Sequence, residues 1–136
     1  MVEPTYLLDT NMWIFLLKGK NPTLTERLGK IDPAAIALCS VVKAELWHGT
    51  HRYGNRERRV SILHTIFEQH KSFGFDDRAA EVYGQICHDL EARGQVIGPM
   101  DMLIAAIALA NRLTLVTHNT NEFSRLDELL LEDWTA

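Results

Sequence analysis

The stretch YLLDTN, residues 6–11, decides the fold, because it joins an apolar segment directly to a helix through a carboxylate. Thr5 to Leu8 suit a short buried strand, and residues 11–18, NMWIFLLK, suit an apolar helix that ends near Gly19. Asp9 stands between the two. Either Asp9 caps the helix by accepting hydrogen bonds from its first amides, or it binds a ligand that needs negative charge in a dry place.

The rest of the chain continues this alternation of short apolar runs and helical patterns. The further strand candidates are AAIALCS (34–40), KSFGF (71–75), TLVT (114–117) and LLLEDW (129–134). The further helical patterns are NPTLTERLG (21–29), VVKAELWHG (41–49) with Ser40 as its expected cap, RERRVSILHTIFEQH (56–70), DRAAEVYGQICHDLEARG (77–94) and GPMDMLIAAIALANRL (98–113). Such alternation predicts an α/β fold with a mostly parallel sheet covered on both faces.

Length and composition narrow the class of protein. The 136 residues suit one domain, residues 1–136, and no apolar run is long enough for a membrane span. The N-terminal residues lack the basic start and the cleavage pattern of a signal peptide. The two cysteines, Cys39 and Cys87, fall in apolar and helical patterns, so we expect reduced core thiols and a cytoplasmic protein. The net charge of −4 argues against a strongly basic nucleic-acid binder.

Three further acids follow strands in the same way as Asp9. Glu45 lies one turn into the helix after the second strand, Asp101 lies in the first turn of the apolar helix, and Glu122 follows the fourth strand. Parallel strands bring these positions to one edge of the sheet. Any one acid has an ordinary explanation, such as capping, the helix dipole, an ion pair or solvation. Together the acids would repel one another unless a cation neutralised them, and an all-carboxylate set favours Mg²⁺ or Mn²⁺ acting on phosphates.

Four motifs in this order resemble those of a known family. YLLDTN, SVVKAELWHG, IGPMDMLIAAIAL and LVTHNTNEF are similar to the motifs of PIN-domain ribonucleases, and more closely to those of VapC toxins from type II toxin–antitoxin pairs. The resemblance covers essentially the whole chain. It implies a PIN-like, three-layer α/β/α fold with a mostly parallel central sheet of four to five strands. It also implies a Mg²⁺- or Mn²⁺-dependent endoribonuclease that is held inactive by a cognate VapB-like antitoxin, forms a homodimer, and joins a larger assembly with the antitoxin.

Carried over by position, the resemblance implies a site of four acids. Asp9 and Asp101 would be the main metal ligands, and Glu45 would complete the site or orient the attacking water. Many PIN domains carry an aspartate soon after the threonine of the fourth strand, where this chain has His118 and Asn119, so Glu122 is expected to be the fourth catalytic and metal-binding acid. Polar residues matching positions that support the site are Asn11, Ser40, Thr117 and Asn119.

The resemblance also implies the kind of RNA that is cut, and the charge and apolar character of other residues suggest where RNA or a protein partner binds. VapC relatives cut structured RNA, and the subgroup that this chain resembles includes enzymes that cut initiator tRNA in the anticodon loop, so tRNA is the expected substrate. Hydrolysis would leave a 5′-phosphate and a 3′-hydroxyl. Residues expected to contact RNA or the antitoxin are Arg52, Arg56, Arg58, Arg59 and Trp13, although Trp13 equally suits the core.

Two other functions have to be weighed against this one. A PIN domain that has lost catalysis would serve as a binding module, but the acids at Asp9, Glu45 and Asp101 are intact. A HAD-type Mg²⁺ phosphatase also begins with a strand that ends in aspartate. It needs a second aspartate two residues later, where this chain has Asn11. A zinc site is disfavoured because His48 and His51 lack further ligands at zinc-site spacing.

Overall fold

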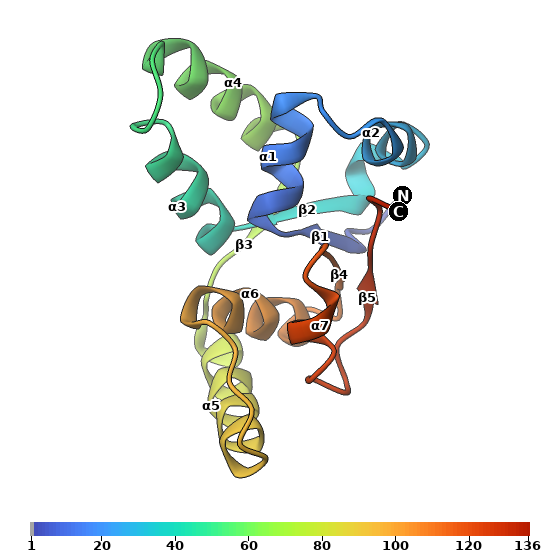
Figure 1. The fold of residues 1–136 in the computed structure, drawn as a ribbon, viewed down its shortest axis with the longest axis vertical. Helices are drawn as coiled ribbons and strands as arrows, with labels where there is room; N and C mark the ends of the chain where they lie inside the picture. Colours follow the sequence, from blue (N-terminus) through green and yellow to red (C-terminus); the bar gives the residue numbers. More distant parts are fainter. Residues whose placement is uncertain (1) are drawn as a thin grey trace.

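A five-stranded parallel sheet forms the centre of the protein. The computed structural model describes residues 2–136 and orders the strands β3-β2-β1-β4-β5 (Figure 1). The strands are β1 (Tyr6–Leu8), β2 (Ile36–Cys39), β3 (Lys71–Phe73), β4 (Thr114–Val116) and β5 (Leu131–Glu132). All neighbouring pairs run parallel, with Leu7 opposite Ala37 on one side and Leu115 on the other. The predicted α/β fold, and the upper value of four to five strands, are confirmed.

Helices cover both faces of this sheet and complete the three layers. On one side lie α1 (Thr10–Lys18), α2 (Pro22–Gly29), α3 (Ser40–Gly49) and α4 (Arg56–Glu68) (Figure 1). On the other lie α5 (Asp77–Ala92), α6 (Pro99–Ala110) and the short α7 (Thr120–Phe123), and α5 packs on α6 away from the sheet. A 3₁₀ turn at Pro33–Ala35 leads into β2. After β3 the chain passes to β4 on the other side of β1, so helices are placed on both faces of the sheet.

Local sequence explains where several helices begin and end. Asn21 and Asp76 accept hydrogen bonds from the Leu24 and Ala79 amides, at 3.0 and 2.9 Å, and so cap α2 and α5. Gly19 ends α1 in a left-handed conformation, φ +63°. The expected cap at Ser40 is wrong. Ser40 is already the first residue of α3, and no side chain caps this helix.

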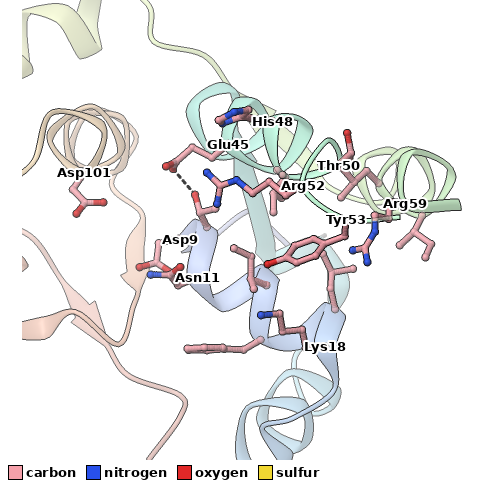
Figure 2. Close-up of a pocket in the computed structure, with 18 residues that line it drawn as sticks. Asp9, Asn11, Lys18, Glu45, His48, Thr50, Arg52, Tyr53, Arg59 and Asp101 are labelled. Carbon is pink, nitrogen blue, oxygen red and sulfur yellow. Dashed lines mark hydrogen bonds between the residues drawn. The ribbon is translucent and has the colours of Figure 1, made fainter. Parts of the chain in front are cut away.

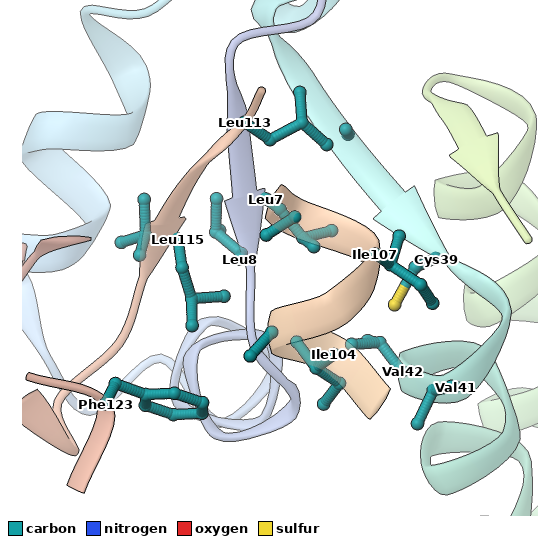
Figure 3. Close-up of a cluster of buried hydrophobic side chains, with 14 of the residues drawn as sticks. Leu7, Leu8, Cys39, Val41, Val42, Ile104, Ile107, Leu113, Leu115 and Phe123 are labelled. Carbon is teal, nitrogen blue, oxygen red and sulfur yellow. The ribbon is translucent and has the colours of Figure 1, made fainter. Parts of the chain in front are cut away.

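The core lies between the sheet and its helices (Figure 3). Leu7 and Leu8 of β1 are fully buried, as are Ile104 and Ile107 of α6 and Leu115 of β4. Helix α6 is apolar almost all round because it packs against the sheet on one side and α5 on the other. Within residues 2–136, no helix has both the length and the apolarity needed to cross a bilayer.

The order of the strands creates a natural binding position at one edge of the sheet. From β1 the chain continues to β2 and β3 on one side, whereas β4 and β5 lie on the other. In open parallel sheets, ligands bind beyond the carboxyl ends of the strands where the order reverses. Here that point lies between the ends of β1 and β4, where Asp9 and Thr117 follow the strands.

We predict that stability depends strongly on the central strand. Leu7→Ala removes a fully buried side chain next to both neighbouring strands, and should lower the free energy of unfolding by about 2–5 kcal/mol. Urea denaturation monitored by circular dichroism measures the loss. The matched control is Leu130→Ala, because Leu130 is 65% exposed, and its effect should stay within about 0.5 kcal/mol. Equal effects of the two substitutions would contradict this account of the core.

Candidate active site

Asp9 is a buried carboxylate at the end of the central strand. Its side chain is only 6% exposed, and its Oδ1 accepts a hydrogen bond of 3.0 Å from the Met12 amide. The capping role considered from the sequence is therefore present. Burial raises the pKa of Asp9 above its ordinary value, and the nearby Glu45 and Asp133 add to this, whereas Thr117 and the Met12 amide oppose it. Capping alone leaves this charge poorly compensated.

Glu45 approaches Asp9 from α3, the helix that packs beside α1. Its Oε1 accepts a hydrogen bond of 2.5 Å from the Thr10 hydroxyl, which is the next residue after Asp9 (Figure 2). Thr10 thus holds the Glu45 carboxylate on the side of Asp9. We did not predict this role for Thr10 from the sequence, because it depends on how α1 and α3 pack together.

Asp101 adds a third carboxylate from the first turn of α6. The pKa of Asp101 is raised to about 6. The largest cause is burial, followed by the negative charges of Asp9, Glu122 and Glu45 in decreasing order. Asp101 therefore lies within electrostatic reach of the other three acids predicted from the sequence. Asp9 directly precedes α1, and the other three acids come from α3, α6 and α7.

Glu122 joins this group through the residues that follow β4. The Asn119 side-chain amide donates a hydrogen bond of 3.1 Å to Glu122 Oε2, and the Asn119 backbone amide donates one of 2.9 Å to the Thr117 hydroxyl. Thr117 is completely buried. Asn119 therefore orients Glu122, and Thr117 fixes the turn that carries both.

The negative charge of the four acids lacks a cationic partner in the part of the chain that the structure describes. The ion pairs found there involve Glu26, Glu132 and Asp133, and none involves Asp9, Glu45, Asp101 or Glu122. Converging carboxylates without a counter-charge favour binding of a cation.

The donor set fits a hard divalent cation. Within residues 2–136, no three His, Cys, Asp or Glu side chains stand close enough to hold one ion together. Mg²⁺ does not need such a cage, because it keeps several water ligands and uses one or two carboxylates together with substrate phosphates. Oxygen ligands without thiolate or imidazole also fit Mn²⁺ better than zinc.

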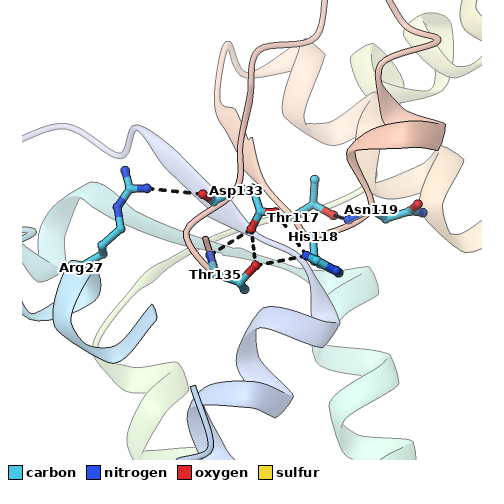
Figure 4. Close-up of polar contacts among 6 residues, drawn as sticks. All are labelled: Arg27, Thr117, His118, Asn119, Asp133 and Thr135. Atoms are coloured by element: carbon cyan, nitrogen blue, oxygen red, sulfur yellow. Dashed lines mark hydrogen bonds and ion pairs between the residues drawn. The ribbon is translucent and has the colours of Figure 1, made fainter. Parts of the chain in front are cut away.

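His118 lies beside the acids but belongs to a different set of contacts. Its Nδ1 lies 3.2 Å from Asp133 Oδ2 and 3.1 Å from the Thr135 hydroxyl, while Arg27 donates to the Asp133 carbonyl (Figure 4). Burial would raise the pKa of Asp133, but hydrogen bonds from Thr135 and from His118 outweigh it, so this pKa is lowered. These contacts attach the C-terminal residues to the end of β4.

A cavity of about 580 Å³ opens from three of the acids (Figure 2). Asp9, Glu45 and Asp101 line it, and so do Arg52 and Arg59. Other lining residues are Asn11, Ile14, Phe15, Lys18 and Tyr53. Carboxylates and guanidinium groups thus line the same cavity, between α1 and the segment that joins α3 to α4.

The remaining predicted residues are less closely tied to this cavity. Arg56 and Arg58 are exposed but do not line it, and neither does Ser40. The expected contact of Trp13 with RNA or antitoxin is wrong. Trp13 is only 4% exposed and packs in the core, with its ring 5.5 Å from that of His70. The position two residues on, Phe15, faces the cavity instead, together with Tyr53, which carried no recognisable motif in the sequence.

The raised pKa of Asp101 gives a testable dependence of stability on pH. Because this pKa rises from 3.8 to about 6 on folding, the folded chain binds more protons than the unfolded chain between these values. Stability contributed by Asp101 is therefore present below about pH 3.8 and falls as the pH rises through 6. In EDTA, the Tm of wild type should fall relative to that of Asp101→Asn as the pH rises through this window.

A divalent cation should reverse that difference at neutral pH. Added Mg²⁺ should raise the Tm of wild type more than that of Asp101→Asn, because binding to the folded chain alone stabilises it. Asp127→Asn, an exposed acid outside the cavity, should follow wild type in both experiments. A Tm difference between wild type and Asp101→Asn that is independent of both pH and Mg²⁺ would contradict the charge repulsion.

Comparison with known proteins gives a consistent picture. The model of the PIN domain family matches residues 6–129. The tRNA(fMet)-specific endonuclease VapC of Shigella flexneri is 33% identical over 130 residues, covering 96% of this chain and 98% of the relative. Ribonuclease VapC2 of Rickettsia felis is 35% identical, covering 95% and 97%.

Solved structures agree with these sequence relatives. A crystal structure of DNA-bound VapBC from Salmonella typhimurium matches with a TM-score of 0.88 and 30% identity, covering 96% of this chain and 98% of that one. The fold shared with that structure, and the motifs of this chain around Asp9, Glu45, Asp101 and Glu122, lead to the same family as the sequence comparison. The chain belongs to the PIN-domain family and, within it, resembles the VapC ribonucleases over nearly its whole length.

Proposed function

We propose that this protein is a divalent-metal-dependent endoribonuclease that acts as the toxin of a toxin–antitoxin pair. The observation that carries the proposal is the convergence of Asp9, Glu45, Asp101 and Glu122, which has no cationic partner in residues 2–136. Burial, and then the charges of the other three acids, raises the pKa of Asp101. Relatives named ribonuclease or endonuclease VapC support the reaction type. The proposal takes residues 1–136 as a single PIN domain.

Asp9 and Asp101 are proposed to hold Mg²⁺ or Mn²⁺, with Glu45 and Glu122 as further ligands or as groups that orient water. A bound divalent cation supplies Lewis acidity, which makes water a better nucleophile and stabilises charge on the phosphate. The burial of Asp9 keeps its carboxylate in one orientation, through the Met12 amide. Thr10 and Asn119 orient Glu45 and Glu122 by hydrogen bonds.

The chain's own residues then decide what happens to the RNA. Glu45 and Glu122 are proposed to accept a proton from the attacking water, and the support is that each is half-buried and oriented by one hydrogen bond. Attack in line with the leaving 3′ oxygen leaves a 5′-phosphate and a 3′-hydroxyl. Arg52 and Arg59, which line the cavity, are proposed to bind backbone phosphates. Asn11, which also lines the cavity, is proposed to bind the phosphate through its amide.

The proposed substrate is tRNA, and specifically the anticodon loop of initiator tRNA. The support is the similarity to the Shigella flexneri relative, which is named a tRNA(fMet)-specific endonuclease. A loop suits the cavity better than a duplex, because single-stranded bases are free to enter a concave site.

The proposed partners are a VapB-like antitoxin and a second copy of this chain. The support is the similarity to the VapBC structure from Salmonella typhimurium, which was solved with bound DNA. The antitoxin would neutralise the enzyme by covering the cavity. A PIN domain acting only as a binding module is disfavoured by the four acids, and a HAD-type phosphatase is disfavoured by Asn11, which stands where that family needs a second aspartate.

The central test is the loss of RNA cleavage on neutralising Asp9. Protein purified away from any antitoxin is incubated with total RNA and with isolated tRNA, in Mg²⁺ or in EDTA. Asp9→Asn should lower the cleavage rate by more than about 100-fold, because the substitution removes a metal ligand. Asp127→Asn is the matched control and should cleave at the wild-type rate. Sequencing of the products should find 5′-phosphate ends.

Two results would reject this mechanism. Equal cleavage by wild type and Asp9→Asn, or cleavage that survives EDTA, would exclude catalysis by metal-binding acids. Absence of cleavage with every RNA, while RNA binding persists, would instead favour the binding module.

Thr10 offers a separate test of how Glu45 is positioned. Thr10→Val keeps the shape of the side chain but removes the hydrogen bond to Glu45. We expect affinity for Mn²⁺, measured by calorimetry, to fall by about 10- to 100-fold, as for other groups that orient metal ligands. Thr10→Ser retains the hydroxyl and should retain affinity. Unchanged affinity in Thr10→Val would show that Glu45 does not need this contact.

A further inference from the structure

The connection between α3 and α4 presents an aromatic ring at the cavity. Tyr53 has a large aromatic side chain, yet this residue is 56% exposed. It lines the cavity together with Asp9, Glu45 and Asp101. Figure 2 shows the ring reaching from this connection toward α1. An aromatic side chain left so exposed beside a charged site is available to a ligand.

The ring is supported from one side by an arginine. The Arg59 guanidinium lies 4.9 Å from the centre of the Tyr53 ring, and Arg59 Nε donates a hydrogen bond of 3.0 Å to the Gly54 carbonyl. At the start of the connection, Thr50 is buried and its hydroxyl donates to the Trp47 carbonyl at 2.7 Å. Tyr53 is therefore held between a buried anchor and a stacked cation, which makes the ring a preorganised surface.

The position of the ring relative to the acids defines what it can bind. Tyr53 lies four residues beyond the end of α3, the helix that carries Glu45, and both residues line the cavity. Arg52 lies between them in the sequence and also lines the cavity. A single-stranded nucleic acid matches this sequence of groups, with one phosphate at the acids, the next at Arg52, and a base at Tyr53.

We propose that Tyr53, backed by Arg59, is a stacking platform for one unpaired RNA base next to the phosphate that is cut. This inference rests on the proposed ribonuclease function and specifies its substrate as RNA with an unstacked nucleotide beside the cleavage site. The cavity of about 580 Å³ is within the usual range of about 300–1,000 Å³ for small-molecule sites, so its volume suits one flipped-out nucleotide. Stacking tolerates any base, so the platform positions RNA without reading its sequence.

The test measures stacking on full-length protein that carries Asp9→Asn, so that RNA is bound without being cut. The probe is a short unstructured RNA oligonucleotide with 2-aminopurine placed at each position in turn, whose fluorescence is quenched by stacking. Quenching at one position is expected with Tyr53 and with Tyr53→Phe, and should be lost in Tyr53→Ala and Tyr53→Leu. Affinity for the oligonucleotide should fall by about 10-fold in the last two variants.

A second measurement couples the base to the ring. Removing the base at the quenched position, as an abasic nucleotide, should weaken binding to the Tyr53 protein and leave binding to Tyr53→Ala unchanged. Phe75→Ala is the matched control, because Phe75 is another exposed aromatic (39%) that packs on Tyr83 and does not line the cavity. It should bind and quench like the parent. Thermal unfolding of each variant confirms that it is folded.

The outcomes separate this inference from the function on which it rests. Equal quenching and affinity in Tyr53 and Tyr53→Ala, while the wild-type enzyme still cuts RNA, would overturn the platform alone. Position-specific quenching would support the platform even if wild type failed to cut, whereas that failure would contradict the nuclease. If Tyr53→Ala left RNA binding intact and weakened only co-purification with the antitoxin, the ring would belong to a protein interface, and the platform would be overturned.

Discussion

The charge of Asp9 is the constraint on which the rest of the site depends. Its carboxylate stands at the end of a fully buried strand, is itself buried, and receives a backbone hydrogen bond but no cation from residues 2–136. A buried anion of this kind is unfavourable unless something compensates it. The neighbouring acids increase this repulsion instead of relieving it. The site is therefore less stable than an apolar equivalent, and binding of a divalent cation would remove the repulsion.

The sheet makes this arrangement possible by giving the acids fixed positions. Parallel strands end at one edge, and the helices α1 and α3 begin there directly after β1 and β2. Asp9 and Glu45 are thus brought together by the packing of α1 against α3, and Asp101 reaches them from the opposite face through α6. The apolar core of β1, β4 and α6 holds these helix starts in place. The stability of the apolar core therefore allows the charged side chains at the edge of the sheet to keep fixed positions.

The arginines that line the cavity suggest how a bound RNA strand lies relative to the acids. Arg52 lies on the connection from α3 to α4 and Arg59 in the first turn of α4, and both line the cavity. Positive and negative side chains in one cavity suit an RNA strand. The arginines would bind its backbone phosphates, and a metal held by the acids would bind the phosphate that reacts. The net charge of −4 hides these local charges, so overall composition was a poor guide to partners.

The class of fold and the acids proposed for the site were predicted from the sequence alone, because both depend on local patterns. Buried parallel strands are short apolar runs, and acids at strand ends are visible wherever such a run stops. The sequence did not predict the start of α3 at Ser40, the burial of Trp13, or the roles of Thr10 and Tyr53. Which face of α1 is buried, and which side chain of α3 meets Thr10, is decided by packing between helices distant in the sequence. Only the tertiary structure brings Glu45 to Thr10 and Tyr53 to the cavity, because those contacts join segments that share no local pattern.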